Sequence, residues 1–252
     1  MSEETKIGNK EVYFKETQWT NILRVKNKSS LGYNETLNQF ISIYWKPIYF
    51  YIRRSGKDIE TAKDLTQEFF TVFLEKDFIK DVERSKGRFR SFMLAALQHF
   101  LSKQREREST QKRGGGKIAF SLEDLISDDT KFDIQDKTQA TPEKIFIQEW
   151  ALTILHNALE NLHQEYQAQS RARYFDVLKS YLSASMGKDQ KVTYTDIAKK
   201  LGISENDVTN YLHRARRRYR EFIEDEIKKY VADEIELKEE LKVLFSAFSD
   251  NP

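Results

Sequence analysis

Apolar residues in this chain recur at steps of three and four, which is the period of one face of an α-helix. Between residues 34 and 54, for example, Leu37, Phe40, Tyr44 and Ile48 fall on one stripe. No segment shows the sustained two-residue alternation of a half-buried strand. Only 3 Pro and 9 Gly occur among 252 residues, so the chain has few tight turns. The sequence therefore predicts an all-α protein.

The predicted helices form two groups, separated by a stretch whose Gly residues disfavour a continuous helix. That stretch begins at Gly114-Gly115-Gly116 and continues as an acidic, polar segment, which is typical of a linker. Thr141 and Pro142 then mark the start of another helix, as a capping residue followed by Pro in the first turn. We predict two small helical domains joined by a flexible linker. The predicted segments are a flexible N-terminus (1–18), a first helical domain (19–113), an acidic linker (114–140), a second helical domain (141–222) and a C-terminal helical extension (223–252).

The charge of the chain is unevenly distributed, although its formal net charge is only +2. Residues 84–117 carry ten Lys and Arg against two Glu, whereas residues 121–149 carry eight acids against three Lys. A second basic cluster lies at Arg214, Arg216, Arg217, Arg218 and Arg220. Two basic blocks separated by an acidic one favour a polyanionic partner that is contacted at two places. The alternative is that these charges only solvate helix surfaces.

Several classes of protein are disfavoured by what the sequence lacks. There is no Cys, so disulfides and Cys-based zinc sites are excluded, and a reducing cytoplasm is the expected location. No apolar stretch approaches the roughly 18 residues of a membrane span. The four His residues show no metal-ligand spacing, and neither a phosphate-binding Gly loop nor a nucleophile motif occurs. We therefore expect no enzyme activity, no cofactor and no metal.

The most specific local pattern lies at residues 192–219 and predicts a helix-turn-helix. Ile197 and Ala198 would face inward on the first helix, and the small Ala198 would let the second helix cross closely. Gly202 ends the first helix. Ser204 and Asp207 then have the spacing of a capping box at the start of the second helix.

The second helix of this motif has two distinct faces. Val208, Leu212 and Ala215 are spaced to face the core. Early polar residues on the opposite face are suited to base edges in a major groove, and the arginines are suited to phosphates. An ordinary helical hairpin with a charged outer face is the alternative. The outward residues proposed to contact DNA are Asn206, Thr209, Asn210, His213, Arg216 and Arg217.

Three stretches together resemble the sigma-70 family of bacterial RNA polymerase sigma factors. Residues 58–70, Asp-Ile-Glu-Thr-Ala-Lys-Asp-Leu-Thr-Gln-Glu-Phe-Phe, resemble the DAEDLxQExF signature of region 2. Residues 87–96 resemble the segment of region 2 beside the −10 DNA contacts, although Phe92 stands where Trp is frequent. The helix-turn-helix resembles region 4. The order, with no region 3, is that of the extracytoplasmic-function (ECF) group, here with a C-terminal extension.

This resemblance implies three sets of functional residues. Binding to the beta-prime clamp of core RNA polymerase is implied for Asp64, Gln67 and Glu68, supported by Leu65 and Phe69. Contacts to the −10 promoter element are implied for Arg88, Arg90, Gln98, His99, Lys103 and Arg105. Recognition of the −35 element falls to the six outward residues of the helix-turn-helix. The expected partners are core polymerase (beta-prime clamp and beta flap) and promoter DNA, with an anti-sigma factor or other regulator as a further candidate and no membrane.

Two other functions remain open on the sequence alone. A helix-turn-helix regulator that acts without polymerase would dimerise and bind a palindrome. A helical adaptor that binds only proteins would not need its basic clusters. The apolar residues of the extension (223–252) either pack on the second domain, which we expect, or form an amphipathic surface for a regulator.

Overall fold

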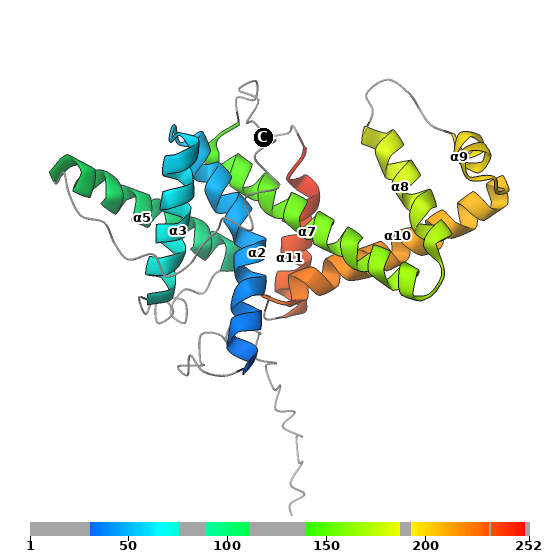
Figure 1. Ribbon diagram of the computed structural model, residues 1–252, viewed down its shortest axis with the longest axis horizontal. Helices are drawn as coiled ribbons and strands as arrows, with labels where there is room; N and C mark the ends of the chain where they lie inside the picture. The colour runs from blue at the N-terminus through cyan, green and yellow to red at the C-terminus, as the bar shows by residue number, and fades with distance from the viewer. Residues whose placement is uncertain (1–30, 76–88, 111–139, 187–192, 232, 250–252) are drawn as a thin grey trace, which may run out of the picture.

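The structure is a computed structural model that describes residues 31–75, 89–110, 140–186, 193–231 and 233–249. Within these ranges every regular element is an α-helix, which confirms the predicted all-α class (Figure 1). The predicted N-terminal segment, and the predicted linker apart from its last residue, lie outside the described residues. The helices are α2 (Leu31–Arg54), α3 (Ile59–Glu75), α5 (Phe89–Thr110), α7 (Pro142–Ala168), α8 (Ala172–Met186), α9 (Tyr194–Leu201), α10 (Glu205–Lys228) and α11 (Glu234–Ser246).

The first hydrophobic core is built around α2, which contacts both α3 and α7. Its largest fully buried side chains include Tyr44 of α2, Phe70 of α3 and Leu97 of α5. The N-terminal half of α7 contributes Phe146 and Trp150 to the same core, and both are fully buried. Burial of side chains this large supplies most of the apolar stabilisation of this half of the molecule.

The second core lies at the other end of α7 and α10. It joins Leu162 of α7, Leu178 of α8, Ile197 of α9, and Val208 and Leu212 of α10, all of them buried. These residues hold the helix-turn-helix, α9 and α10, against α8 and the last turns of α7. Figure 1 shows this cluster at the end of the molecule opposite to α3 and α5.

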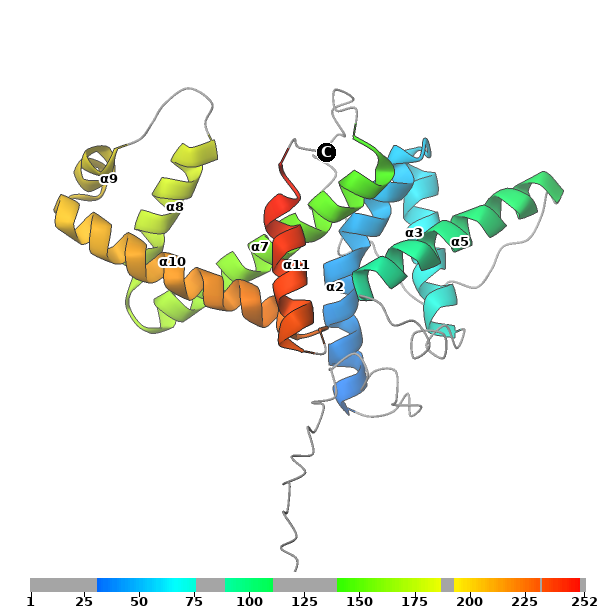
Figure 2. The ribbon, with the colours of Figure 1, turned by 180° about the vertical axis from the view of Figure 1, so that it is seen from behind.

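Two helices pass from one core to the other. α7 buries Trp150 in the first core and Leu162 in the second, while α10 buries Leu212 in the second and Ile227 in the first. Both views of the ribbon show α7 and α10 running along this connection (Figures 1 and 2). The first helix of the predicted unit 141–222 therefore contributes buried residues to both cores.

The C-terminal extension packs on α7, the first helix of the predicted second domain, and on α10. Leu237 and Leu244 of α11, followed by Ala247, are buried in the first core. Glu240 of α11 also pairs with Arg90 of α5. The apolar face of α11 therefore completes the first core instead of covering the second one. The opposite side of α11 leaves Ile235 and Phe245 exposed.

Two features of the helices concern where they end or continue. α7 extends to Ala168. The break comes at Ser170, whose φ of 56° is left-handed and cannot continue an α-helix. α2 runs through Pro47 as one helix. No helix in the described ranges is long and apolar enough to cross a membrane.

Candidate nucleic-acid and polymerase interfaces

The first helix of the helix-turn-helix is fixed by its cap. Thr193 is the N-cap of α9, and its side chain accepts a hydrogen bond from the backbone N–H of Asp196. The Thr193 hydroxyl in turn donates to Asp196 Oδ2 over 2.7 Å, and the Thr193 backbone N–H donates to the same oxygen over 3.0 Å. These two donors hold the pKa of Asp196 below its usual range, with the hydroxyl as the larger cause. The carboxylate is therefore ionised and completes a capping box.

The turn between the two helices has the geometry that its sequence predicted. Gly202 ends α9 with a φ of 64° and a ψ of 40°, a left-handed conformation that suits Gly. The N–H of Ile203 then donates to the carbonyl of Ala198 over 3.1 Å. Ser204 caps α10 and forms the predicted capping box with Asp207, where Ser204 Oγ donates to Asp207 Oδ2 over 2.6 Å. This hydrogen bond is the main reason why the pKa of Asp207 lies below its usual range.

One face of α10 is buried as the sequence predicted. Val208, Leu212 and Ala215 are all buried, and Ala198 of α9 lies in the same core. Across the turn, Thr195 Oγ1 donates to Glu205 Oε1 over 2.8 Å and links the two helices directly. The start of α10 is thus held by the core beneath it and by two polar contacts at the turn.

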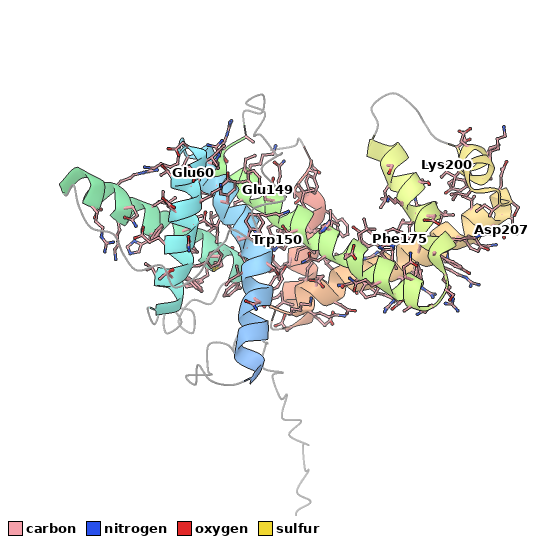
Figure 3. All side chains as sticks on the ribbon, in the orientation of Figure 1. Glu60, Glu149, Trp150, Phe175, Lys200 and Asp207 are labelled. Carbon is pink, nitrogen blue, oxygen red and sulfur yellow. The ribbon has the colours of Figure 1, made fainter. Side chains whose placement is uncertain are left out.

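The other face of α10 is open to solvent. The six outward residues, Asn206, Thr209, Asn210, His213, Arg216 and Arg217, are all exposed. The Thr209 hydroxyl already donates to the carbonyl of Glu205 over 3.0 Å. Figure 3 shows Asp207 and Lys200 at this outer end of the molecule. The arrangement places polar side chains on the first turns of a capped helix, with cations on the turns behind them.

The basic cluster of α10 is divided by the structure into cations with different roles. Arg217 keeps 74% of its side chain exposed and has only a long ion pair with Glu221, at 3.9 Å. Arg218, the next residue, points the other way and binds Glu165 of α7 through Nη2 at 2.6 Å and Nε at 2.9 Å. Arg218 also donates to Glu221 over 2.7 Å. Only part of this cluster is therefore available to a polyanion.

Sequence reasoning overlooked two contacts of this region. The spacing of Thr193 and Asp196 is that of a capping box, so the start of α9 could have been read from the chain. The guanidinium carbon of Arg216 lies 4.1 Å from the centroid of the Tyr181 ring on α8. No local signal pointed to this second contact, because the two residues meet only when α8 packs on α10.

The segment that resembles region 2 presents an acidic helix face. Asp58 precedes α3 and accepts a hydrogen bond from the backbone N–H of Thr61 over 2.9 Å. The implied polymerase-binding residues divide by burial in the expected way: Leu65 and Phe69 are buried, Gln67 is half-buried, and Asp64 and Glu68 are exposed. Glu68 lies 4.0 Å from Arg107 of α5, both on the surface.

The implied −10 residues do not all lie on one surface. Four residues of α5 are exposed, namely Gln98, His99, Lys103 and Arg105. Gln98 also donates to Glu143 of α7 over 3.1 Å. Arg88 lies outside the described residues. Arg90 departs from the expectation, because it is only 6% exposed and is paired with Glu240 of α11.

A comparison with protein families matches residues 190–218 to the family model of sigma-70, region 4. The matched segment covers α9, the turn and the first part of α10. The match is confined to these residues, so it shows that this segment is similar to region 4 of sigma-70. No curated protein matches the chain, and no solved structure matches it. Among the residues that the structure describes, no cluster of His, Asp or Glu is suited to hold a metal ion.

Proposed function

We propose that this protein is an RNA polymerase sigma factor of the ECF kind, which binds core polymerase and directs it to promoters. One observation carries the proposal: the segment that matches region 4 contains a turn with a cap on each side, and within the same segment α10 presents six exposed polar and cationic residues. A helix of this kind fits the major groove, with its early residues at base edges and its arginines near phosphates. We assign this face of α10 to the −35 element.

The first half of the chain supplies the other two interfaces of the proposal. The acidic face of α3, with Asp64, Gln67 and Glu68, would bind the beta-prime clamp of core polymerase, and the buried Leu65 and Phe69 would hold that face in place. The exposed residues of α5 would contact the −10 element together with Arg88. These assignments rest on the resemblance of residues 58–70 and 87–96 to region 2 and on the exposure of the side chains.

The test is transcription in vitro with purified bacterial core polymerase on a library of promoters. The wild-type chain should bind core polymerase and produce specific transcripts. Glu68→Lys should weaken binding to the polymerase, whereas Glu234→Lys, an equal charge change at an exposed site on α11, should not. The absence of any binding to core polymerase would instead favour a helix-turn-helix regulator that acts alone.

A second pair of variants tests the DNA-binding face. Arg216→Glu with Arg217→Glu should abolish promoter-dependent transcription while binding to core polymerase persists. Lys228→Glu is the control for each of the two single reversals, because Lys228 is exposed on the same helix but lies far from the turn. If the Arg216 and Arg217 variant stays fully active, the cations are dispensable and a protein-only adaptor is the better interpretation.

A further inference from the structure

Arg90 and Glu240 form a buried ion pair between α5 and α11, although they are 150 positions apart in the sequence. Arg90 Nε lies 3.0 Å from Glu240 Oε2, and Arg90 Nη2 lies 3.3 Å from Glu240 Oε1, so both carboxylate oxygens are engaged. The side chains are 6% and 2% exposed. On its other side the guanidinium lies over the Trp150 ring, 5.0 Å from its centroid. Arg90 is therefore completely enclosed by protein.

Stability alone does not explain this pair. Removing two charges from water costs several kcal/mol per ion, and well-packed apolar side chains of similar size often serve as well or better. The nearby phenols of Tyr44 and Tyr230 supply no opposite charge, because phenols are neutral at pH 7 and burial raises the pKa of both further. A buried cation in an otherwise apolar and aromatic pocket suggests that Arg90 has a second partner in another state of the molecule.

The geometry of the pair indicates which partner that is. A carboxylate that engages two guanidinium nitrogens has the arrangement that a phosphate group would adopt on the same arginine. Arg90 belongs to the basic stretch 84–117, and Lys103 and Arg105 on the same helix remain exposed. α5 thus carries cations near both of its ends, and α11 covers the one in its first turn.

We propose that α11 is an autoinhibitory helix, in which Glu240 occupies the place of a DNA phosphate on Arg90. In the closed state, α11 blocks one end of the α5 surface against single-stranded promoter DNA. When α11 is released, Arg90 becomes available, and the aromatic Trp150 beside it offers a ring on which a base can stack. This inference rests on the proposed function, because it concerns the regulation of the same DNA-binding surface.

The attachment of α11 is compatible with such release. Leu237 and Leu244 anchor one face, and Gln148 Nε2 of α7 donates to the carbonyl of Ala247 over 3.2 Å. The opposite face leaves Ile235 and Phe245 exposed, with 70% and 58% of their surface in solvent. The buried ion pair adds to this apolar face and hydrogen bond in holding the helix, so loss of the pair should shift the equilibrium toward the open state.

The first variant to test is Glu240→Gln, which removes the charge and preserves the shape of the side chain. Binding of a labelled single-stranded oligonucleotide to the full chain is followed by fluorescence anisotropy. Because apparent affinity scales with the fraction of open molecules, we expect Glu240→Gln to bind roughly tenfold more tightly. Glu234→Gln, the same charge change at an exposed site of α11, should change affinity by less than about twofold.

A double variant shows whether the gain acts through Arg90. Arg90→Ala combined with Glu240→Gln should lose the gain and bind no more tightly than the wild type. If the double variant keeps the gain, the effect comes from the lost negative charge alone and the proposal is overturned. Arg90→Met combined with Glu240→Leu replaces the ion pair by an apolar contact and keeps α11 bound to the first core. This double variant should bind the oligonucleotide no more tightly than the wild type.

Chemical labelling separates opening from unfolding. Phenylglyoxal modifies exposed arginines, so Arg90 should be protected in the wild type and reactive in Glu240→Gln, while circular dichroism shows retained helix. If Arg90 stays protected, Leu237→Asp with Leu244→Asp releases α11 from its apolar seam and should produce the same gain. An open α11 with reactive Arg90 and unchanged affinity for the oligonucleotide would refute the inference.

The two proposals fail in distinguishable ways. Binding of the oligonucleotide needs no polymerase, whereas the proposed function is measured as transcription with core polymerase. If Arg90 is reactive in the variant, affinity for the oligonucleotide does not increase, and the protein still supports transcription, only the inference about α11 is contradicted. If the variant binds the oligonucleotide more tightly but the protein never binds polymerase, the proposed function is contradicted. The inference that α11 covers a nucleic-acid site at Arg90 is then unaffected.

Discussion

Arg217 and Arg218 are neighbours on α10, yet the structure predicts opposite effects for their loss. Arg217 lies on the exposed face that we assign to DNA, with 74% of its side chain in solvent. Arg218 is 34% exposed and joins α10 to Glu165 of α7 and to Glu221. Arg217→Ala should therefore weaken DNA binding without loss of stability, and Arg218→Ala should do the reverse.

The sizes of these effects follow from the contacts. Each phosphate contact contributes about 0.9 to the slope of log affinity against log salt on duplex DNA, so Arg217→Ala should lower the slope by about that amount. Over an increase in salt of about fourfold, this difference amounts to roughly 3.5-fold in relative affinity. Arg218 makes charge-assisted hydrogen bonds to two carboxylates, but its partial exposure screens them, so Arg218→Ala should cost about 1–2 kcal/mol of folding free energy.

Two measurements on the same preparations decide the matter. Fluorescence anisotropy with a duplex at several salt concentrations gives the slope, and urea denaturation gives the free energy of unfolding. The wild type and the two variants form a matched set, because each variant loses one positive charge from adjacent positions. The assignment of faces on α10 would be refuted if Arg218→Ala reduced the slope while Arg217→Ala left it unchanged.

Three further outcomes concern the fold that positions this face. Gly202→Ala should cost about 1–2 kcal/mol in urea denaturation from backbone strain alone, because a Cβ there meets no atom within 4 Å. Leu212→Ala should cost about 2–5 kcal/mol by the same measurement, since it empties a buried site under the DNA-binding face. Hydrogen bonding from Arg218 lowers the pKa of Glu165. The ionised Glu165 therefore contributes to the free energy of unfolding above the ordinary carboxyl pKa, and this contribution is lost as pH falls through the lowered pKa. In Glu165→Gln the free energy of unfolding should not show this part of its decrease with falling pH.

The helix-turn-helix could be predicted from the sequence because its determinants are local. Gly202 adopts a left-handed conformation that few other residues tolerate, and Ser204 with Asp207 satisfies backbone groups within one turn. The inward positions of Val208 and Leu212 follow from the helical period alone. Each of these features involves residues that are at most a few positions apart, so no knowledge of tertiary packing was needed.

The environment of Arg90 could not be predicted in this way. Its sequence neighbours are basic and aromatic, which suggested a surface that contacts DNA, but its partner Glu240 lies 150 positions away. A pairing over that separation depends on how α11 docks, and helical periodicity gives no information about docking. In the same way, the periodic pattern of α7 does not indicate that Trp150 and Leu162 enter different cores.

The continuity of α7 and α10 has a mechanical consequence. At 1.5 Å per residue, the 24 residues of α10 form a continuous helix about 36 Å long, and α7 runs beside it. Two helices packed side by side transmit rotation and resist bending. The end of the molecule with the helix-turn-helix therefore cannot rotate freely relative to the end that carries α3 and α5. A change in the distance between the proposed DNA-binding faces of α5 and α10 would require α7 or α10 to break, or α7 to separate from α2.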